Sequence, residues 1–374
     1  MKYKTYTLGQ LAKIKYGKSK KKVASEDGNI PIYGTGGLMG YANAYLYDKP
    51  SVLIGRKGTI NKVRYIEEPF WTVDTLFYTE INESLVYPRY FYYMLSQIDL
   101  LQYNEGTTIP SLRADTLNRL EFQVPTLEEQ EKIVSLMYPV EEKIKNNRAI
   151  NKNLLYQAMA IFNNAIEHSA SITLAELGKL ADIKGGKRLP KGINLTNIPN
   201  SHPYIRVRDL NNVVFASLST NYEYVDDETQ KTISRYITTT NDVLLSIVGT
   251  IGLTAIVDES LNMANLTENC VKITNLNNIS PEYLLLYLRS SRGTKEIKKN
   301  TVGAVQSKLP IKNIQRITIP LLPQSEMKSL NSILTALFNQ ISSNDAESRC
   351  LTDIRNSLLP KLMSGELDVS DINI

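Results

Sequence analysis

Apolar side chains recur every seven residues between Glu128 and about Phe162, the pattern of a helix that packs along a coiled-coil seam. The two interleaved series are Ile133, Val140, Asn147, Leu154, Ile161 and Met137, Ile144, Asn151, Ala158, Ala165. The pattern returns 197 residues later without a gap, as Leu330, Leu337, Asn344, Leu351, Leu358 and Leu334, Ile341, Ser348, Arg355, Leu362. A helix of this length, about 55 to 60 Å, cannot bury its seam on itself. The pattern therefore predicts two long helices that pack against each other in antiparallel orientation.

The polar position of the first series, Asn147, falls on Asn344 in the second series. A buried asparagine in a coiled-coil seam fixes the register of the helices at some cost in stability. We expect Asn147 and Asn344 to have this role.

The segments that precede the two helices are also related to each other. Matching positions are Thr7, Leu8, Leu11, Lys13 with Thr173, Leu174, Leu177, Lys179; Gly58, Thr59, Ile60 with Gly249, Thr250, Ile251; Pro88, Tyr90 with Pro281, Tyr283; and Gly106, Leu112 with Gly303, Leu309. The chain is therefore one sequence of roughly 190 residues written twice. Two copies are too few for a solenoid and favour a pseudo-twofold molecule. The predicted segments are residues 1–125, 126–168, 169–322 and 323–374.

Each segment before a helix alternates short β-rich stretches with Gly, Asn and Asp turns. The predicted strands cover residues 30–33, 51–54, 76–78, 243–248 and 254–257, and helices are expected around 89–101 and 281–298. The strand-helix alternation of a Rossmann fold is absent from this pattern. The sequence predicts two α+β domains with mixed or antiparallel sheets.

Positive charge gathers in these two segments. The net charge is +4 for residues 1–125 and +5 for 169–322, whereas the helical segments carry −1 and −3. Residues 1–64 alone hold 13 basic and 3 acidic side chains. This concentration indicates a polyanionic partner, with a solvated lysine-rich surface as the alternative.

Composition removes several other classes of protein. The 42% hydrophobic content excludes a disordered chain, and the sequence holds no apolar run of membrane-spanning length and no signal peptide, so we expect a cytoplasmic protein. The two cysteines and two histidines argue against a zinc site. No catalytic motif of a methyltransferase, hydrolase or nuclease stands out, and the chain has the character of a binding protein.

Basic loops supply the candidate DNA contacts, because lysine neutralises phosphates, arginine pairs with guanine or phosphate, and asparagine pairs with adenine. In the first segment the candidates are Lys18, Lys20, Lys21, Lys22, Arg56, Lys57, Thr59, Asn61 and Lys62. In the second segment they are Lys184, Lys187, Arg188, Arg206 and Arg208. The second segment has Ile247-Val248 where the first has Arg56-Lys57, so the two segments should not read the same sequence.

A glycine cluster, Gly34-Thr35-Gly36-Gly37-Leu38-Met39-Gly40, follows an apolar stretch. Its spacing matches neither the dinucleotide-binding nor the phosphate-loop pattern. A turn between two strands is the favoured interpretation, and a loop whose backbone approaches a phosphate is the alternative.

Together these segments resemble the specificity subunit of type I restriction-modification systems. The resemblance lies in residues 31–37 with Gly40-Tyr41, in 53–59, in 70–75, in Val124-Pro125-Thr126-Leu127-Glu128-Glu129-Gln130 before the first helix, and in residues 362–367. The second half departs from the family at Met327, where glutamine would be expected, and lacks the glycine-rich signature.

This resemblance implies a subunit without catalytic activity of its own. Each globular segment would read one half of a split site in double-stranded DNA, and the helices would fix the gap between the halves. Two modification subunits that use S-adenosylmethionine and restriction subunits that use ATP and magnesium would be its partners. Two rival hypotheses remain: an autonomous DNA methyltransferase or nuclease, and a structural connector with basic domains that bind another protein.

Overall fold

The computed structural model describes residues 1–220, 222–303, 307–370 and 372, and its contacts divide the chain into two compact units. Unit 1 combines residues 1–144 with 350–374, and unit 2 comprises residues 145–349. Each long helix contributes one part to each unit. The predicted division into four segments was made along the sequence. The contacts do not test it, because they group part of each long helix with a globular domain, and it stays a prediction.

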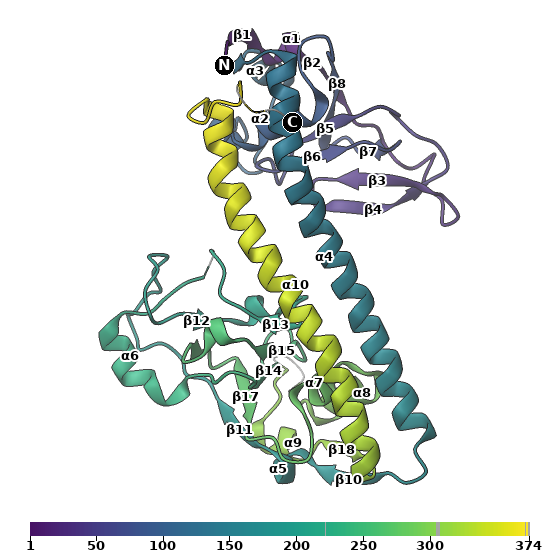
Figure 1. The fold of residues 1–374 in the computed structure, drawn as a ribbon, viewed down its shortest axis with the longest axis vertical. Helices are drawn as coiled ribbons and strands as arrows, with labels where there is room; N and C mark the ends of the chain where they lie inside the picture. Colours follow the sequence, from purple (N-terminus) through teal and green to yellow (C-terminus); the bar gives the residue numbers. More distant parts are fainter. Residues whose placement is uncertain (221, 304–306, 371, 373–374) are drawn as a thin grey trace. The chain divides into compact units, whose positions relative to one another are not determined.

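Unit 1 is an α+β domain with three small sheets (Figure 1). Its elements are β1 (Lys4–Thr7), α1 (Leu8–Leu11), β2 (Ala12–Tyr16), β3 (Ile30–Gly34), β4 (Gly37–Ala42), β5 (Ser51–Gly55), β6 (Val63–Ile66), β7 (Trp71–Thr72), β8 (Leu76–Ile81), α2 (Pro88–Ser96), η1 (Leu100–Tyr103), α3 (Ala114–Asn118) and β9 (Glu121–Val124). An antiparallel sheet has the order β2-β8-β5-β6, a mixed sheet has the order β4-β3-β7, and β1 pairs with β9. The predicted strands of this segment are confirmed, whereas the helix expected around 89–101 ends at Ser96 and is followed by the separate η1 from Leu100.

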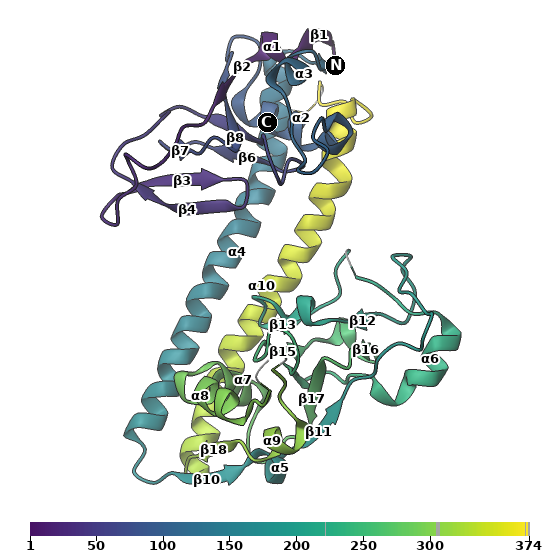
Figure 2. The same ribbon diagram turned by 180° about the vertical axis from the view of Figure 1, so that it is seen from behind.

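Unit 2 repeats this plan with a mixed sheet of order β11-β17-β14-β15-β13 (Figure 2). Its elements are β10 (Thr173–Glu176), α5 (Leu177–Leu180), β11 (Asp182–Gly185), β12 (Tyr204–Ile205), η2 (Val207–Leu210), β13 (Phe215–Ala216), α6 (Asp227–Ile233), η3 (Ser234–Tyr236), β14 (Val243–Ser246), β15 (Thr254–Val257), η4 (Glu259–Leu261), β16 (Asn265–Leu266), β17 (Cys270–Thr274), α7 (Pro281–Arg289), α8 (Ser291–Asn300), α9 (Ile311–Gln315) and β18 (Thr318–Leu321). The helix predicted over 281–298 is in fact two, because α7 ends at Arg289 and Ser290 caps a new helix.

The duplication is visible in how each globular segment begins and ends. Strand β1 pairs antiparallel with β9, and β10 pairs antiparallel with β18. In unit 1 the first strand is followed by a short helix whose Gly9 faces Asn118, and in unit 2 the equivalent Gly178 faces Gln315. The short helices begin at Leu8 and at Leu177, so the predicted matches of Leu8 with Leu174 and of Leu11 with Leu177 are wrong by three residues. The first and last strands of each segment are therefore held side by side.

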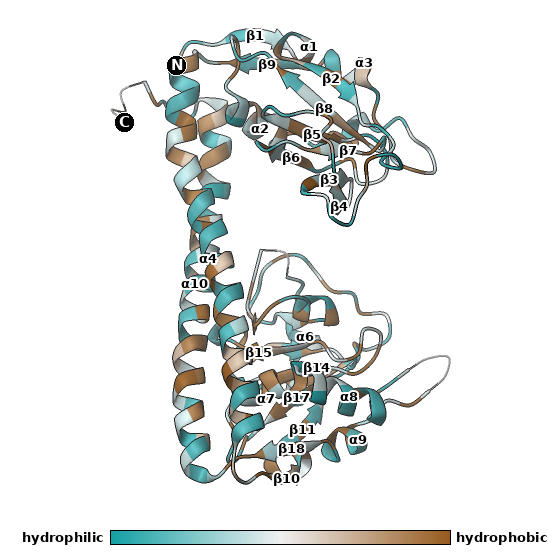
Figure 3. Ribbon diagram, turned by 90° about the vertical axis from the view of Figure 1, so that its right-hand side faces the viewer, coloured by the Kyte–Doolittle hydropathy of each residue, from teal (hydrophilic) through white to brown (hydrophobic). Residues whose placement is uncertain are grey.

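The long helices are α4 (Leu127–His168, 42 residues) and α10 (Gln324–Ser364, 41 residues). In unit 2, α4 and α10 run antiparallel, because Asn147 contacts Asn344 while Asn151 contacts Ile341. Apolar and polar residues alternate along both helices (Figure 3). Among the described residues, no helix is long and apolar enough to cross a membrane.

Half of the twenty predicted seam positions are buried, including Ile133, Met137, Ile144 and Asn147 in α4, and all the others except Leu358 are half-buried. The prediction for Leu358 is wrong: this residue is 37% exposed, whereas its neighbour Leu359 is only 6% exposed. An α-helix repeats every 3.6 residues, so a strict seven-residue series drifts off the buried face over several turns.

A polar layer interrupts the apolar seam within unit 2. The Asn147 side-chain amide donates to the Asn344 carbonyl (3.3 Å) and to a Glu347 carboxylate oxygen (2.8 Å). The Asn344 amide donates to Asn151 Oδ1 at 2.8 Å, and Asn151 donates to Asp345 at 2.7 Å. Antiparallel pairing thus brings the predicted asparagines together. Burial raises the pKa of the Asp345 carboxyl, and its hydrogen bond with Asn151 opposes that shift.

We expect Asn147→Leu to raise the melting temperature of the protein by about 2 to 4 °C, equivalent to roughly 1 kcal/mol. The Asn147 side-chain oxygen is buried and has no hydrogen-bond partner among the described residues, so leucine removes a polar atom that is costly to bury. The control, Asn344→Leu, should give no gain, because it leaves Asn151 Oδ1 without its donor. Calorimetry of both variants checks this, and a lower melting temperature for Asn147→Leu would contradict it.

Candidate nucleic-acid interface

The glycine cluster forms the hairpin between β3 and β4. The two strands pair antiparallel from Ile30 with Ala42 to Gly34 with Gly37, with an irregularity in register between Ile32 and Tyr33. Gly37 has φ +122°, which glycine adopts without strain. The prediction of a turn between two strands is confirmed. Beyond the turn, β4 exposes three large side chains to solvent: Leu38, Met39 and Tyr41.

A second turn, residues 55–60, joins β5 to the segment before β6. A Cβ on Gly55 would lie 2.2 Å from the Thr59 carbonyl oxygen, so the turn closes only around glycine. The Gly58 N–H donates to the Pro110 carbonyl at 2.9 Å, and Lys57 forms a β-bridge with Ser111. The turn is therefore braced by the loop that precedes α3.

These two turns meet at Thr35 of the hairpin tip, which Arg64 on β6 also contacts. Arg64 Nη2 donates to the Thr35 carbonyl at 3.4 Å, and a Cβ built on Gly37 would lie 3.2 Å from Nη1. A Cβ built on Gly58 would lie 3.7 Å from Thr35 Oγ1. The hairpin tip and the basic turn, 20 residues apart in the sequence, thus form one surface. Arg64 was not among the predicted contacts, although it lies in the basic segment that ends the turn.

Among the described residues, Arg56 is held in place by contacts other than an ion pair with a carboxylate. Its Nη1 donates to the Asp74 carbonyl oxygen at 2.7 Å, and its guanidinium lies 5.1 Å from the centre of the Tyr16 ring. A cation above an aromatic face is attracted by the ring quadrupole. The guanidinium is therefore oriented while its charge stays available to an external anion.

Arg56→Ala should weaken binding to the correct DNA site by about 1 to 3 kcal/mol if the guanidinium makes a bidentate base contact. The loss should concentrate at one position of the site, since the neighbouring lysines still bind phosphates. Competition binding against a panel of single-base variants measures this. An equal loss on all duplexes would instead assign Arg56 to a phosphate.

The lysine-rich segment after β2 is fixed by its backbone. Lys18 N–H donates to the Thr72 carbonyl at 2.8 Å, and its own carbonyl accepts from Trp71 Nε1 at 2.9 Å. Lys18, Lys21 and Lys22 are exposed and Lys20 is half-buried. In the part of unit 1 that the structure describes, none of these four forms an ion pair. Their charge is thus not neutralised within the unit.

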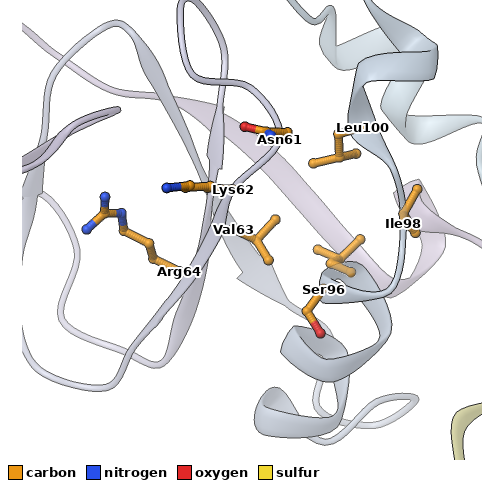
Figure 4. A pocket seen from close by; sticks show the side chains of 8 residues that line it. Asn61, Lys62, Val63, Arg64, Ser96, Ile98 and Leu100 are labelled. Carbon is orange, nitrogen blue, oxygen red and sulfur yellow. The ribbon is translucent and has the colours of Figure 1, made fainter. Parts of the chain in front are cut away.

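Asn61 and Lys62 line a pocket of about 300 Å³ together with Arg64. Its apolar wall is formed by Val63, Leu95, Ile98 and Leu100. In Figure 4 the side chains of Lys62 and Arg64 extend in the same direction, away from Ile98 and Leu100. Thr59 is exposed in the adjoining turn. The candidates of unit 1 therefore occupy neighbouring loops around the hairpin tip and Arg64.

The candidates of unit 2 are arranged differently, because acidic side chains neutralise most of them. Arg206 and Arg208 both pair with Glu223, with Arg206 Nη1 at 2.8 Å. Arg188 pairs with Glu268 at 2.8 Å, and Lys184 lies 3.5 Å from Asp182. Lys187 lies over the Tyr236 ring at 5.5 Å.

Asp209 also belongs to this group of charges, because its Oδ1 lies 3.5 Å from Arg208 Nε. Burial raises the pKa of Asp209, and the hydrogen bond that it accepts from the Arg206 N–H opposes the shift. The hydrogen bond from Asn275 and the charge of Lys184 lower the pKa of Asp182. Arg206 and Arg208 thus belong to an internal charge network, which sequence reasoning did not anticipate.

Two basic α+β units on one chain, each completed by part of two long helices, define a DNA-recognition protein of duplicated design. The chain belongs to the family of the type I restriction modification DNA specificity domain, whose model matches residues 1–156 and 172–350. It therefore has the character of a specificity subunit, as the resemblance predicted.

Individual relatives are distant but cover most of the chain. The type I restriction enzyme MjaIX specificity subunit of Methanocaldococcus jannaschii is 23% identical over 359 residues, covering 87% of this chain and 80% of its own. The HindI specificity subunit of Haemophilus influenzae is 22% identical over 370 residues, covering 77% and 79%. The crystal structure of the type I restriction-modification S subunit from M. genitalium has a TM-score of 0.62 at 18% identity, over 97% of this chain and 96% of that one. This last match supports the fold.

Proposed function

We propose that this chain is the non-catalytic DNA-reading subunit of a type I restriction-modification complex, with double-stranded DNA as its ligand. Unit 1 and unit 2 each read one half of a bipartite site. The observation that carries the proposal is the convergence of the β3–β4 hairpin, the turn 55–60 and Arg64 on one basic surface of unit 1. Rigid loops that carry unneutralised cations satisfy the requirements of both phosphate binding and base reading.

The predicted contacts divide into two roles. Lys18, Lys20, Lys21, Lys22, Lys57 and Lys62 bind phosphates, because lysine is a flexible point charge. Arg56, Thr59 and Asn61 lie in or beside the glycine turn and read base edges, since their donors are directional. The exposed hairpin side chains Leu38 and Met39 add apolar contacts at the same surface.

The partners follow from the family. Two modification subunits, which use S-adenosylmethionine to methylate adenine, bind partly through the long helices, and restriction subunits that use ATP and magnesium complete the assembly. The helices set the gap between the two half-sites. In this scheme the cofactors belong to the partner subunits and the chain itself carries none.

Co-expression with a modification subunit from the same genome tests the proposal. We expect the two proteins to co-purify and host DNA to carry N6-methyladenine in a two-part sequence with a fixed gap. The control is the modification subunit alone, which should leave that sequence unmethylated. Methylation by this chain alone would establish an autonomous enzyme, and failure to co-purify without any bipartite methylation would favour the connector hypothesis.

A further inference from the structure

The turn of unit 2 that corresponds to the basic turn of unit 1 carries no charge. Residues 247–253, between β14 and β15, read Ile-Val-Gly-Thr-Ile-Gly-Leu, where unit 1 has Arg56 and Lys57 before the equivalent glycine. Gly249 has φ +77° and Gly58 has φ +88°, so the equivalent glycine of each turn has the same left-handed backbone conformation. The turn of unit 2 has this glycine but not the cations that precede it in unit 1.

One of the lost cations reappears on the other side of a β-bridge. In unit 1 Lys57 is bridged to Ser111, and in unit 2 the equivalent bridge joins Val248 to Lys308. The flanking hydrogen bonds match as well: Leu112 N–H donates to the Arg56 carbonyl at 2.9 Å, and Leu309 N–H donates to the Ile247 carbonyl at 3.0 Å. The same bridge therefore carries one lysine in each unit, on opposite strands.

Helix α8 supplies further cations beside the same turn. A Cβ built on Gly252 would lie 3.9 Å from Ile297 Cγ2, so the buried side of α8 faces the turn. The exposed side carries a basic stripe: Arg292, Lys295, Lys298 and Lys299. Lys299 pairs with Glu296 at 3.7 Å. Within the described part of unit 2, Arg292, Lys295 and Lys298 form no ion pair.

The stripe is built on a rigid support. Ser290 Oγ accepts from the Gly293 N–H at 3.1 Å, and a Cβ on Gly293 would lie 2.0 Å from the Tyr287 carbonyl oxygen, so the corner between α7 and α8 requires glycine. At the other end, Asn313 Nδ2 donates to the Asn300 carbonyl at 2.8 Å. The equivalent place in unit 1 holds the short η1, whose sequence Leu-Leu-Gln-Tyr carries no cation.

We infer that unit 2 binds the phosphate backbone of DNA through the exposed face of α8 and Lys308, and not through Arg206 and Arg208. Arg206 and Arg208 are already paired with Glu223, and freeing them would leave that carboxylate without its partners. Lys295, Lys298 and Lys308 can bind a phosphate without breaking an ion pair within the described part of unit 2. The inference rests on the proposed function and assigns the phosphate contacts of the second half-site.

The first experiment neutralises the stripe with Lys295→Gln and Lys298→Gln together in the full chain. Binding to a mixed-sequence DNA duplex of about 30 base pairs is followed by fluorescence anisotropy between about 50 and 200 mM salt. The slope of log affinity against log salt should fall by about 1.8, since each lost phosphate contact removes about 0.9. The control, Lys179→Gln on α5, changes an exposed lysine that already pairs with Glu176 and should leave the slope unchanged.

The outcomes separate the inference from the proposed function. If the wild-type chain shows no salt-dependent DNA binding, the proposed function fails. If the wild type binds and the double variant matches it, the inference alone is overturned. It is also overturned if the double variant keeps its DNA affinity but no longer co-purifies with the modification subunit, because α8 would then be a protein-binding surface.

A second experiment tests the exchange across the bridge. Lys308→Ser should lower the salt slope by about 0.9, and adding Val248→Lys should restore it, because the lysine returns to the strand that carries it in unit 1. Melting curves of both variants verify that the unit is folded. A double variant that folds but stays as weak as Lys308→Ser would show that this bridge does not face DNA.

Discussion

Replacing Lys20, Lys21, Lys22 and Lys57 with glutamine is expected to lower the affinity for duplex DNA by about a thousandfold near 0.1 M salt. These lysines have no carboxylate partner in the described part of unit 1, so their full charge is available to phosphates. Four lost contacts should also reduce the salt slope by about 3.6. Anisotropy titrations at several salt concentrations measure both quantities.

A charge-matched variant controls for the loss of net charge. It changes four exposed lysines elsewhere in unit 1 to glutamine: Lys2, Lys4, Lys13 and Lys361. Because Lys2 and Lys4 lie before and on β1, Lys13 lies on β2 and Lys361 lies on α10, away from the two turns, the slope should stay close to that of the wild type. Equal losses in the two variants would mean that DNA responds to overall charge, and that the loops have no special role.

Gly55→Ala should destabilise unit 1 by roughly 2 to 4 kcal/mol and lower its melting temperature by about 4 to 16 °C. The added methyl group would lie 2.2 Å from the Thr59 carbonyl oxygen and 2.8 Å from Ile60 Cα. Both obstacles are backbone atoms, so the turn must open, and Arg56 and Lys57 move with it. DNA binding should fall together with stability.

Gly36→Ala, at the tip of the hairpin, is the matched control, because a Cβ there meets no atom within 4 Å. Its effect on stability should stay within about 0.5 kcal/mol. Thermal denaturation followed by circular dichroism compares the two variants. Equal melting temperatures for both would contradict the close packing of the turn around Gly55.

The long helices were predictable because their seam repeats over many turns and is written twice. The hairpin at Gly34–Gly40 was predictable because a glycine cluster after an apolar strand is typical of a turn, and its spacing matched neither nucleotide-binding pattern. The exposure of Leu358 was missed, since a strict seven-residue series ignores the drift of an α-helix. Regular local patterns therefore carried most of the fold.

The partners of charged side chains were not predictable in the same way. Glu223 neutralises Arg206 and Arg208 although it lies at least 15 residues away in the sequence, and no local sequence pattern predicts that contact. The lysine on the bridge with Val248 was also missed, because position 308 aligns with a serine and only the pairing of the two strands reveals the exchange. Candidate sites that depend on long-range pairing need the fold.

The pairing of β1 with β9 and of β10 with β18 has a consequence for the evolution of new specificities. In each half, the first and last strands of the globular segment are neighbours. Lys4 lies opposite Val124 in the first half, and Thr173 lies opposite Leu321 in the second. A segment whose two ends lie together can be exchanged for one of different length without disturbing the scaffold to which it is attached. Gene recombination at these two boundaries would therefore deliver a complete replacement cassette, and a cell could acquire a new DNA target in a single genetic event.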